Sequence, residues 1–468
     1  MDIHFLGGAT TVTGSRFLLT TARARVLIDC GMFQGSPNEA VRNRIALGFD
    51  PTKVDAVVLT HAHLDHCGLL PLLVRNGFDG QIHATAGTVE LASLVLLDSG
   101  KLHQEFAKRE ARWESRNPDK VAADDAKEAA DYRAATELAN AGETAPSEAA
   151  AAATDGGAAT EGTAEHVPTS VAVPELLASV EPGFDPEADL RGQPPELEID
   201  LDAPLYTVAD AEEAIRHFEP TSYDQEIEVA PGVHATFLDA GHILGSAIIR
   251  LRVSEVDGGP ETIIVCSGDL GRPGTPILRD PTIMTEADYV LVESTYGGRE
   301  HEPGEEAIRI LTETIRMVAE SNGVLLVPSF AIGRTQEVVW QLDRLIERGE
   351  IPLLPLYLDS PMATKATEIY RRHPDYYDEE TARFLRDGES PLDYPDAHVT
   401  RDANASRAIA DAPRPYMIIA SNGMLTGGRV VGHLRNLIDD PSATLLFVGY
   451  QGQGTLGAHL QAGATEVK

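Results

Sequence analysis

Residues 56–73 read AVVLTHAHLDHCGLLPLL, and this stretch decides how the rest of the sequence is interpreted. The apolar run AVVLT predicts a buried strand, and a polar loop follows it directly. That loop carries His61, His63, Asp65 and His66 within six residues. Imidazole nitrogens and a carboxylate oxygen are a donor set that suits zinc. A surface loop that happens to be rich in histidine is the alternative, but four ligand-type side chains in six residues favour a metal site.

A site with two metals needs further ligands from elsewhere in the chain. His242 in DAGHILGSA and Asp269 in CSGDLG each follow an apolar run, at the loop end of a predicted strand. Strand ends can converge at one edge of a sheet, and an aspartate can bridge two ions because it has two oxygens. Asp29 in LIDCGMFQG has the same placement. We expect it to support the ligands from behind, as carboxylates beside metal-binding histidines often do.

The pattern of apolar runs divides the chain into parts. Short strand-like runs separated by glycine-rich turns fill 1–113 and return over 201–298, which predicts two parts of one catalytic domain. The segment 114–200 is rich in alanine and acidic residues and poor in large apolar ones, so we expect an insertion that is mostly disordered. Helix and strand patterns alternate over 299–468, which predicts a separate α/β domain.

Composition limits the class of protein. The 468 residues include 73 Asp and Glu against 38 Lys and Arg, a formal charge of −35. No apolar run has the roughly 20 residues of a membrane span, and the start MDIHFLGG does not resemble a signal peptide. The three cysteines form neither a disulfide framework nor a CxxC zinc pattern. We therefore expect a cytoplasmic protein without a membrane partner. The acidic excess, with arginine preferred to lysine, favours adaptation to molar salt over an ordinary acidic surface.

The order of the motifs resembles a known family. LIDCG, THAHLDH, GHILGS and SGDLG look like the metallo-β-lactamase hydrolase superfamily. The later motifs VESTYGGREH, PSFAIGRTQE, LDSPMA, ASNGMLTGGR and VGYQGQGTLG resemble its β-CASP branch. That branch contains RNA-processing nucleases related to the cleavage-and-polyadenylation endonuclease and to bacterial ribonuclease J. The resemblance implies an α/β fold: a metallo-β-lactamase αββα sandwich with an inserted α/β β-CASP cap.

The resemblance also implies roles for the candidate residues. His61, His63 and His242 would hold one Zn²⁺, and Asp65 and His66 the second. Asp269 would bridge the two ions, Asp65 would orient the attacking water, and Glu293 would brace the loops of the active site. The implied activity is zinc-dependent hydrolysis of phosphodiester bonds in single-stranded RNA. Endonuclease and 5′-exonuclease action both stay open, and so does the oligomeric state, with a homo-oligomer as one option.

Two cap motifs supply candidates for substrate binding. Ser329 and Arg334 lie in PSFAIGRTQE, and Ser421, Gly423 and Arg429 lie in ASNGMLTGGR. Small residues let backbone N–H groups approach a phosphate, and arginine adds a bidentate fork. Glycine-rich turns are also ordinary features of α/β folds, so a purely structural role is the alternative.

The family pattern continues with a Ser-Ala-His or Ser-Gly-His motif and then with a strand that ends in His-Gly. Neither motif is found up to Lys468, and His433 and His459 lie in other contexts. From this we expect a shortened chain without the general acid and without one ligand of the second zinc. Two alternatives to the ribonuclease therefore stay open: an RNA-binding or complex-forming subunit that is inactive in this shortened form, and another hydrolase of the superfamily acting on DNA or a small ester.

Overall fold

The computed structural model of the chain describes residues 1–9, 11–35, 42–45, 47–117, 130, 203–300, 303–452 and 454–467. Most of the predicted insertion at 114–200 lies outside these residues. Its first residues belong to helix α4, which runs without a break over Ala86–Arg116. The predicted boundary after residue 113 therefore falls within a continuous helix.

The first sheet has six strands in the order β1-β2-β3-β4-β5-β6. These strands are β1 (Asp2–Gly7), β2 (Arg16–Thr20), β3 (Arg25–Ile28), β4 (Ala56–Val58), β5 (Gln81–Thr85) and β6 (Phe218–Thr221). The strands from β1 to β3 pair antiparallel, and those from β3 to β6 pair parallel. The parallel part places the carboxyl ends of β3 and β4 at one edge of the sheet.

The second sheet has five strands in the order β11-β10-β9-β8-β7. These are β7 (Glu226–Ala230), β8 (Val233–Asp239), β9 (Ala247–Ser254), β10 (Glu261–Cys266) and β11 (Tyr289–Leu291). One apolar core joins the two sheets face to face, and Val26, Val58, Phe237 and Ile249 are buried in it. Burial of a side chain as large as Phe237 contributes about 1.5–3 kcal/mol. This core fixes the two sheets against each other, as in a sandwich.

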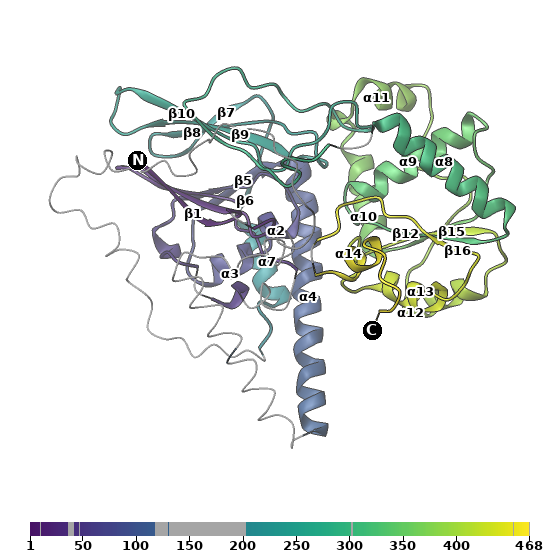
Figure 1. Cartoon of the computed structure of the whole chain (residues 1–468). Coiled ribbons are helices and arrows are strands. Elements are labelled where there is room, and N and C mark those ends of the chain that lie inside the picture. Colours follow the sequence, from purple (N-terminus) through teal and green to yellow (C-terminus); the bar gives the residue numbers. More distant parts are fainter. Residues whose placement is uncertain are drawn as a thin grey trace, which may run out of the picture.

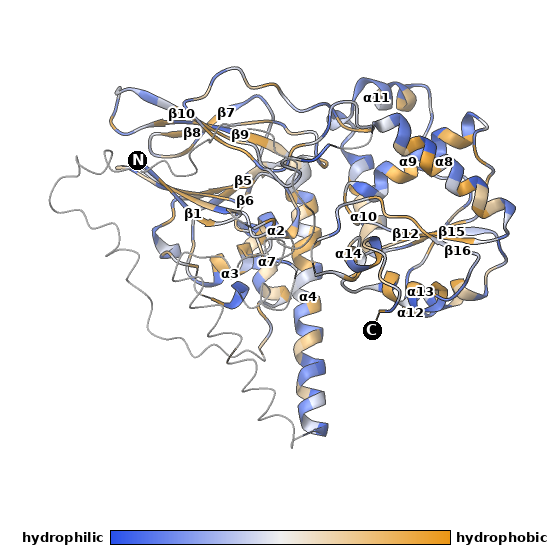
Figure 2. Cartoon of the chain, viewed as in Figure 1, coloured by the Kyte–Doolittle hydropathy of each residue, from blue (hydrophilic) through white to orange (hydrophobic). Residues whose placement is uncertain are grey.

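Helices cover the outer face of the first sheet (Figure 1). They are α2 (Leu64–Cys67), α3 (Leu70–Arg75), α4 (Ala86–Arg116) and α7 (Val208–Arg216); two 3-10 turns, η1 (Arg42–Arg44) and η2 (Pro51–Lys53), lie between β3 and β4. Helix α4 starts at a threonine cap, because Thr85 accepts a hydrogen bond from the Thr88 N–H. Its first half is apolar and buried, and its second half projects away from the domain with a more hydrophilic surface (Figure 2).

The cap contains a third sheet of five parallel strands in the order β14-β13-β15-β12-β16. These strands are β12 (Val324–Pro328), β13 (Leu356–Asp359), β14 (Ala397–Val399), β15 (Tyr416–Ala420) and β16 (Ala443–Leu445). The cap helices are α8 (Gly304–Glu320), α9 (Arg334–Glu347), α10 (Pro361–Arg372), α11 (Glu379–Arg386), α12 (Ala403–Ala408), α13 (Arg429–Leu437) and α14 (Leu456–Gln461), with turns η5 (Pro374–Tyr376) and η6 (Ile409–Asp411). Separate apolar cores on the two faces of this sheet show that it is covered on both sides. Within the described part of the chain, no helix is both long and apolar enough to span a membrane.

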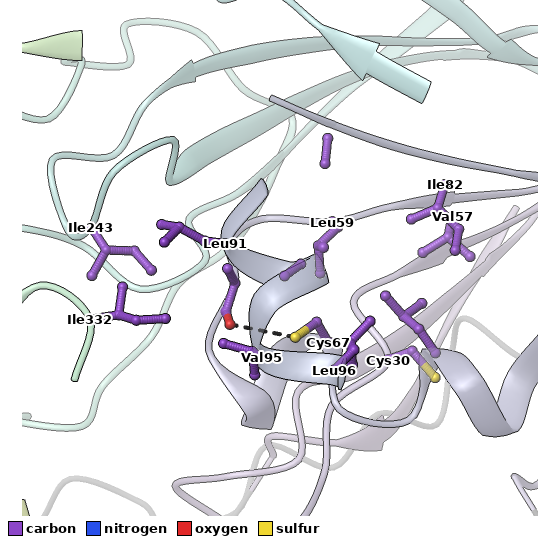
Figure 3. Packing of buried hydrophobic residues seen from close by; sticks show 14 of the residues in the cluster. Cys30, Val57, Leu59, Cys67, Ile82, Leu91, Val95, Leu96, Ile243 and Ile332 are labelled. Atoms are coloured by element: carbon purple, nitrogen blue, oxygen red, sulfur yellow. Dashed lines mark hydrogen bonds between the residues drawn. The ribbon is translucent and has the colours of Figure 1, made fainter. Parts of the chain in front are cut away.

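The cap is fixed to the catalytic domain beside the predicted metal loops. Tyr370 on α10 accepts a hydrogen bond at its hydroxyl from the backbone N–H of Leu244, at 3.0 Å. Ile332 of the cap and Ile243 of the catalytic domain lie close together at one end of the main core (Figure 3). Glu90 on α4 pairs with Arg372 and His373 of the cap. The cap therefore holds the loop after β8 in place.

Candidate metal centre and its cleft

The predicted ligands come from the ends of three strands. His61, His63, Asp65 and His66 follow β4, while His242 follows β8 and Asp269 follows β10. The two sheets bring these ends to the same edge of the sandwich. There His61, His63, His242 and Asp269 form a group whose ligand atoms all lie within 4.8 Å of one another.

The distances within this group fit a tetrahedral metal ion. His63 Nδ1 lies 3.1 Å from His61 Nε2 and 3.2 Å from His242 Nε2. Asp269 Oδ2 lies 3.7 Å from His61 Nε2 and 3.6 Å from His242 Nε2. Ligands about 2.0–2.1 Å from a tetrahedral zinc would be separated by about 3.3 Å. A ring nitrogen offers either one hydrogen or one lone pair, so hydrogen bonding accounts for only one of the two contacts of His63 Nδ1. A shared cation accounts for both.

A second group of possible ligands lies on the other side of Asp269. Asp269 Oδ1 lies 3.2 Å from His66 Nε2, and Asp65 Oδ2 lies 4.0 Å from the same nitrogen. The two oxygens of Asp269 thus face different sets of histidines, as a bridging carboxylate requires. Asp65 and His66 are not part of the compact four-residue group.

The protonation of three of the histidines, His61, His63 and His242, suits ligands to a cation. Burial lowers the pKa of His61 and His242, and it lowers that of His63 to about 3, so these rings are neutral and offer lone pairs. His66 differs. Burial lowers its pKa, but the carboxylates of Asp269 and Asp29 outweigh burial and hold the pKa well above its ordinary value. This field of two carboxylates favours positive charge at the ring of His66.

Asp29 fixes the orientation of two candidate ligands, His66 directly and His61 through Thr60. Its Oδ2 accepts hydrogen bonds from His66 Nδ1 at 2.7 Å and from the Ser15 hydroxyl at 2.9 Å. Its Oδ1 accepts from the Thr60 N–H at 2.8 Å and from the Thr60 hydroxyl at 2.9 Å. Because the Thr60 hydroxyl donates to Asp29, it accepts from His61 Nδ1, 3.1 Å away. Both rings therefore present Nε2 to the metal group. These contacts agree with the supporting role predicted for Asp29.

Two glycines allow the loops to approach one another. A Cβ atom at Gly31 would lie 1.6 Å from the carbonyl oxygen of Asp65, so any larger residue would displace the metal loop. A Cβ atom at Gly271 would lie 1.8 Å from the carbonyl oxygen of Gly241, the residue before His242. These contacts explain the glycines that follow the aspartates in LIDCG and SGDLG.

Glu293 holds the loop that follows Asp269. Its carboxylate accepts hydrogen bonds from the N–H of Leu270 at 3.1 Å and of Thr295 at 3.3 Å. Its own N–H donates to the hydroxyl of Ser267. These contacts agree with the bracing role that the resemblance implies. All three join Glu293 to the loops and none of them to the side chain of a candidate ligand.

The metal group lies in a large cavity between the catalytic domain and the cap, with a volume of about 3230 Å³. Seven arginines line it: Arg16, Arg42, Arg109, Arg272, Arg299, Arg334 and Arg429. Seven carboxylates also line it: Asp65, Asp98, Glu105, Asp269, Glu293, Glu337 and Asp359. The whole chain has 38 basic and 73 acidic residues. The cavity is therefore far less negative than the chain as a whole.

Four of the five predicted substrate-binding residues of the cap line the cavity, and one does not. Arg334, Ser421, Gly423 and Arg429 line the cavity. Arg429 also donates to Asp359 Oδ1 at 2.6 Å, so part of its guanidinium is engaged within the cap. Ser329 lies behind the cavity wall.

Ser329 is only 1% exposed, and its hydroxyl bonds with Thr335 and the Phe330 carbonyl. Its position does not support direct contact with a substrate. It holds the turn before α9 instead.

Several cavity residues are not identified by sequence reasoning. Arg272 follows SGDLG directly and pairs with Glu337 on the cap, so its nearness to Asp269 in the sequence is a usable signal. Arg16 and Arg42 have no such signal, because their approach to the cavity depends on how distant loops fold. Asp359, in LDSPMA, is buried and accepts hydrogen bonds from four side chains of the cap, those of Thr400, Ser406, Arg429 and His433.

Comparison with known proteins gives the class and then the family. A model of the metallo-β-lactamase superfamily matches residues 10–130, and a model of the Beta-Casp domain matches residues 335–460. Together with the sandwich and the ligand group, the first match defines a metal-dependent hydrolase of the metallo-β-lactamase superfamily. Ribonuclease TTHA0252 of Thermus thermophilus is 34% identical over 462 residues, which cover 99% of this chain and 82% of that protein. The chain belongs to the β-CASP branch of the superfamily.

Other relatives carry a different name. The transcription termination factors FttA of Methanosarcina mazei and Methanocaldococcus jannaschii are 29% and 28% identical to this chain, over 99% of its length. The chain spans 58% of the length of each of these factors.

Proposed function

We propose that the chain is a zinc-dependent ribonuclease that hydrolyses phosphodiester bonds of single-stranded RNA at a dinuclear metal site. The observation that carries this proposal is the ligand group at the wall of a cavity of about 3230 Å³. Pockets for small ligands have volumes of about 300–1,000 Å³, so this cavity suits a polymer better than a small ester. The 34% identity to a ribonuclease over 99% of the chain supports the same substrate class.

The lining of the cavity also suits a nucleic acid. Its arginines offer forked N–H donors to phosphate oxygens. Aromatic side chains stand beside them: Tyr296 and Tyr450 meet edge to face, with ring centroids 5.7 Å apart, and Phe330 packs under Gly423. Aromatic rings and arginines together are the usual means of binding single strands without sequence preference.

The residues would divide the work as follows. His61, His63, His242 and Asp269 would hold one zinc ion, and Asp65, His66 and Asp269 the second. Zinc bound there would lower the pKa of water and stabilise charge on the phosphate. The carboxylate of Asp65 would orient the attacking water. Asp29 and Thr60 would keep the histidine rings in the tautomers that bind a cation.

The test is cleavage of a 5′-labelled single-stranded RNA with zinc in molar KCl. The wild-type chain is compared with His63→Ala and with a matched control, His234→Ala, whose histidine lies on β8 outside the cavity lining. We expect cleavage by the wild type and the control, and none by His63→Ala. Equal cleavage by His63→Ala would contradict the metal mechanism, and no cleavage by any of the three would contradict ribonuclease activity of this chain.

Single-stranded DNA and a chromogenic ester are tested in parallel. Hydrolysis of either one without hydrolysis of RNA would identify a different hydrolase of the superfamily. Intact RNA that nevertheless binds tightly would favour an RNA-binding subunit. The resemblance to FttA favours, as a second candidate, a role of this RNA chemistry in the termination of transcription.

We also propose that the protein works in the cytoplasm at high salt. The formal charge of −35 supports this, because molar salt reduces the Debye length to about 3 Å and so removes most of the repulsion between surface carboxylates. Cleavage should therefore be retained at 2 M KCl, and loss of the folded state above 0.5 M KCl would contradict the proposal.

A further inference from the structure

Two arginines and a phenylalanine form a cluster on the catalytic-domain side of the cavity. Arg16 is the first residue of β2, Phe33 follows β3, and Arg42 begins η1. The guanidinium carbon of Arg42 lies 3.8 Å from the centroid of the Phe33 ring, and that of Arg16 lies 6.0 Å from it. We call these three residues the arginine cluster. All three line the same cavity as the metal group.

Arg16 is a buried cation with few partners. It is 6% exposed, and its Nη2 donates to the carbonyl of Leu6 at 3.2 Å. Its Nε has no hydrogen-bond partner, and Arg16 pairs with no carboxylate of the described residues. Burial lowers the pKa of its guanidinium, and the like charge of Arg42 adds to this effect. A desolvated charge without a counter-ion is costly, so an anion at this place would be favoured.

Phe33 orients the second guanidinium. Stacking on an aromatic face leaves the N–H donors of an arginine directed outward along the rim of the ring. The ring itself is held firmly, because Phe33 exchanges two backbone hydrogen bonds with the side chain of Asn43, at 2.7 and 2.8 Å. Phe33 is 3% exposed and Asn43 is 4% exposed. The face on which Arg42 stacks is therefore in place before any ligand binds.

The cluster is connected directly to the metal loop. The N–H of Ser15, the residue before Arg16, donates to the carbonyl of Asp65 at 2.8 Å. The Ser15 hydroxyl donates to Asp29, which holds His66. Arg16 is thus one residue away from a direct contact with the loop that carries the predicted ligands.

We propose that the arginine cluster is a phosphate subsite of the catalytic domain, which holds a phosphodiester group of the RNA strand next to the bond that is cleaved. This inference rests on the proposed function. It would add residues of the catalytic domain to the cap residues Arg334 and Arg429, which line the same cavity. Free phosphate has the same chemistry as the phosphodiester group, so the experiment separates the two.

The experiment measures binding of a fluorescent 2′-O-methyl RNA strand of 12 nucleotides by anisotropy, over a range of KCl concentrations. The titration is run on the metal-free protein in EDTA, because the proposed hydrolysis needs the metal, so binding is read without turnover. The variants are Arg42→Ala and Arg16→Lys. The control is Arg252→Ala, which removes the same charge from a surface arginine paired with Glu226 and Glu261 outside the cavity.

We expect Arg42→Ala to weaken binding about ten-fold and to reduce the slope of log K against log[KCl] by about 0.7, the value for one phosphate contact on a single strand. Arg16→Lys keeps the charge but loses the fork, so it should weaken binding less. The control should match the wild type. Thermal unfolding of each variant shows whether it folds, and Arg42→Ala keeps the test decisive if Arg16→Lys does not fold.

Equal affinity and equal slope for Arg42→Ala and the wild type would overturn the subsite. The melting temperature of each variant is also measured with and without inorganic phosphate. If Arg42→Ala loses the stabilisation by inorganic phosphate but binds the 12-nucleotide strand normally, the cluster holds free phosphate and the subsite is likewise overturned. A wild-type chain that cleaves RNA while Arg42→Ala is unaffected defeats only this inference. A wild-type chain that neither binds nor cleaves RNA defeats the proposed function, and the inference with it.

Discussion

Replacement of Asp29 by asparagine tests whether the second layer of the site controls metal binding. The carboxylate accepts four hydrogen bonds, two at each oxygen. Asparagine is nearly the same size but has an NH₂ group in place of one oxygen. The Thr60 N–H is fixed by the backbone after β4. If this N–H lost its acceptor, the fold would be destabilised by about 1–3 kcal/mol. We therefore expect the amide oxygen to stay with Thr60 and the NH₂ group to face His66.

An NH₂ group facing His66 Nδ1 requires the other tautomer of the ring, in which Nε2 carries the hydrogen and cannot bind a metal. Changes of this kind behind a metal ligand cost 10–100-fold in metal affinity or activity, which is about 1.4–2.7 kcal/mol. We predict that Asp29→Asn weakens zinc binding at the group of His66 by about 10–100-fold. The site of His61, His63 and His242 should change far less, and the stability of the metal-free protein should change little.

The assay is a zinc titration of the metal-free protein against a chromogenic chelator, which resolves two dissociation constants. Asp50→Asn is the matched control, because Asp50 caps an exposed 3-10 turn and does not line the cavity of the metal group. Two unchanged dissociation constants in Asp29→Asn would refute the reasoning. Weaker binding only of the ion at His61, His63 and His242 would also refute it, because Asp29 is expected to act through His66.

Three further predictions concern the cap and the metal. Tyr370→Phe leaves the buried Leu244 N–H without its partner, so the free energy of unfolding should fall by about 1–3 kcal/mol in urea denaturation, and an unchanged midpoint would contradict this. Hydrogen bonds from the cap outweigh burial and hold the pKa of Asp359 below its ordinary 3.8. The carboxylate therefore stabilises the fold above about pH 4, and this stabilisation is lost as the pH falls further. The free energy of unfolding of Asp359→Asn should be lower than that of the wild type at pH 7, and the difference should narrow toward pH 3. Removal of metal with EDTA should lower the melting temperature and zinc should restore it, with about 2.7 kcal/mol of stabilisation at a free zinc concentration of 100 times the dissociation constant, whereas His63→Ala should show a much smaller response.

The candidate ligands could be found in the sequence because each is close to a strong local signal. His61, His242 and Asp269 all follow apolar runs, and the runs are the strands β4, β8 and β10 of the structure. Strand ends in a sandwich meet at its edges, so a ligand-type residue directly after a strand is informative. The same reasoning identifies Asp29 after β3. The motif order then gives the family, and the fold follows from the family.

The remaining parts of the site depend on contacts that no local pattern records. Arg16 reads as an ordinary polar residue at the start of a strand, and only the folded chain places it against Phe33. Ser329 reads as an exposed turn residue, yet the packing of α9 buries it. The end of α4 is missed for another reason. Alanine-rich and charged residues continue from the helix into the segment after it, so composition does not change where the helix ends at Arg116.

The place of the arginines decides how a strongly acidic chain can bind an acidic polymer in high salt. At 1 M salt the Debye length is about 3 Å, so surface arginines such as Arg252 attract phosphate only at contact. Arg16 is 6% exposed, and buried charges are screened much less. Binding should therefore depend on the arginines inside the cavity and hardly at all on the surface charge of −35. It follows that neutralising surface carboxylates would change folding at low salt, while RNA affinity at high salt would respond to changes within the cavity.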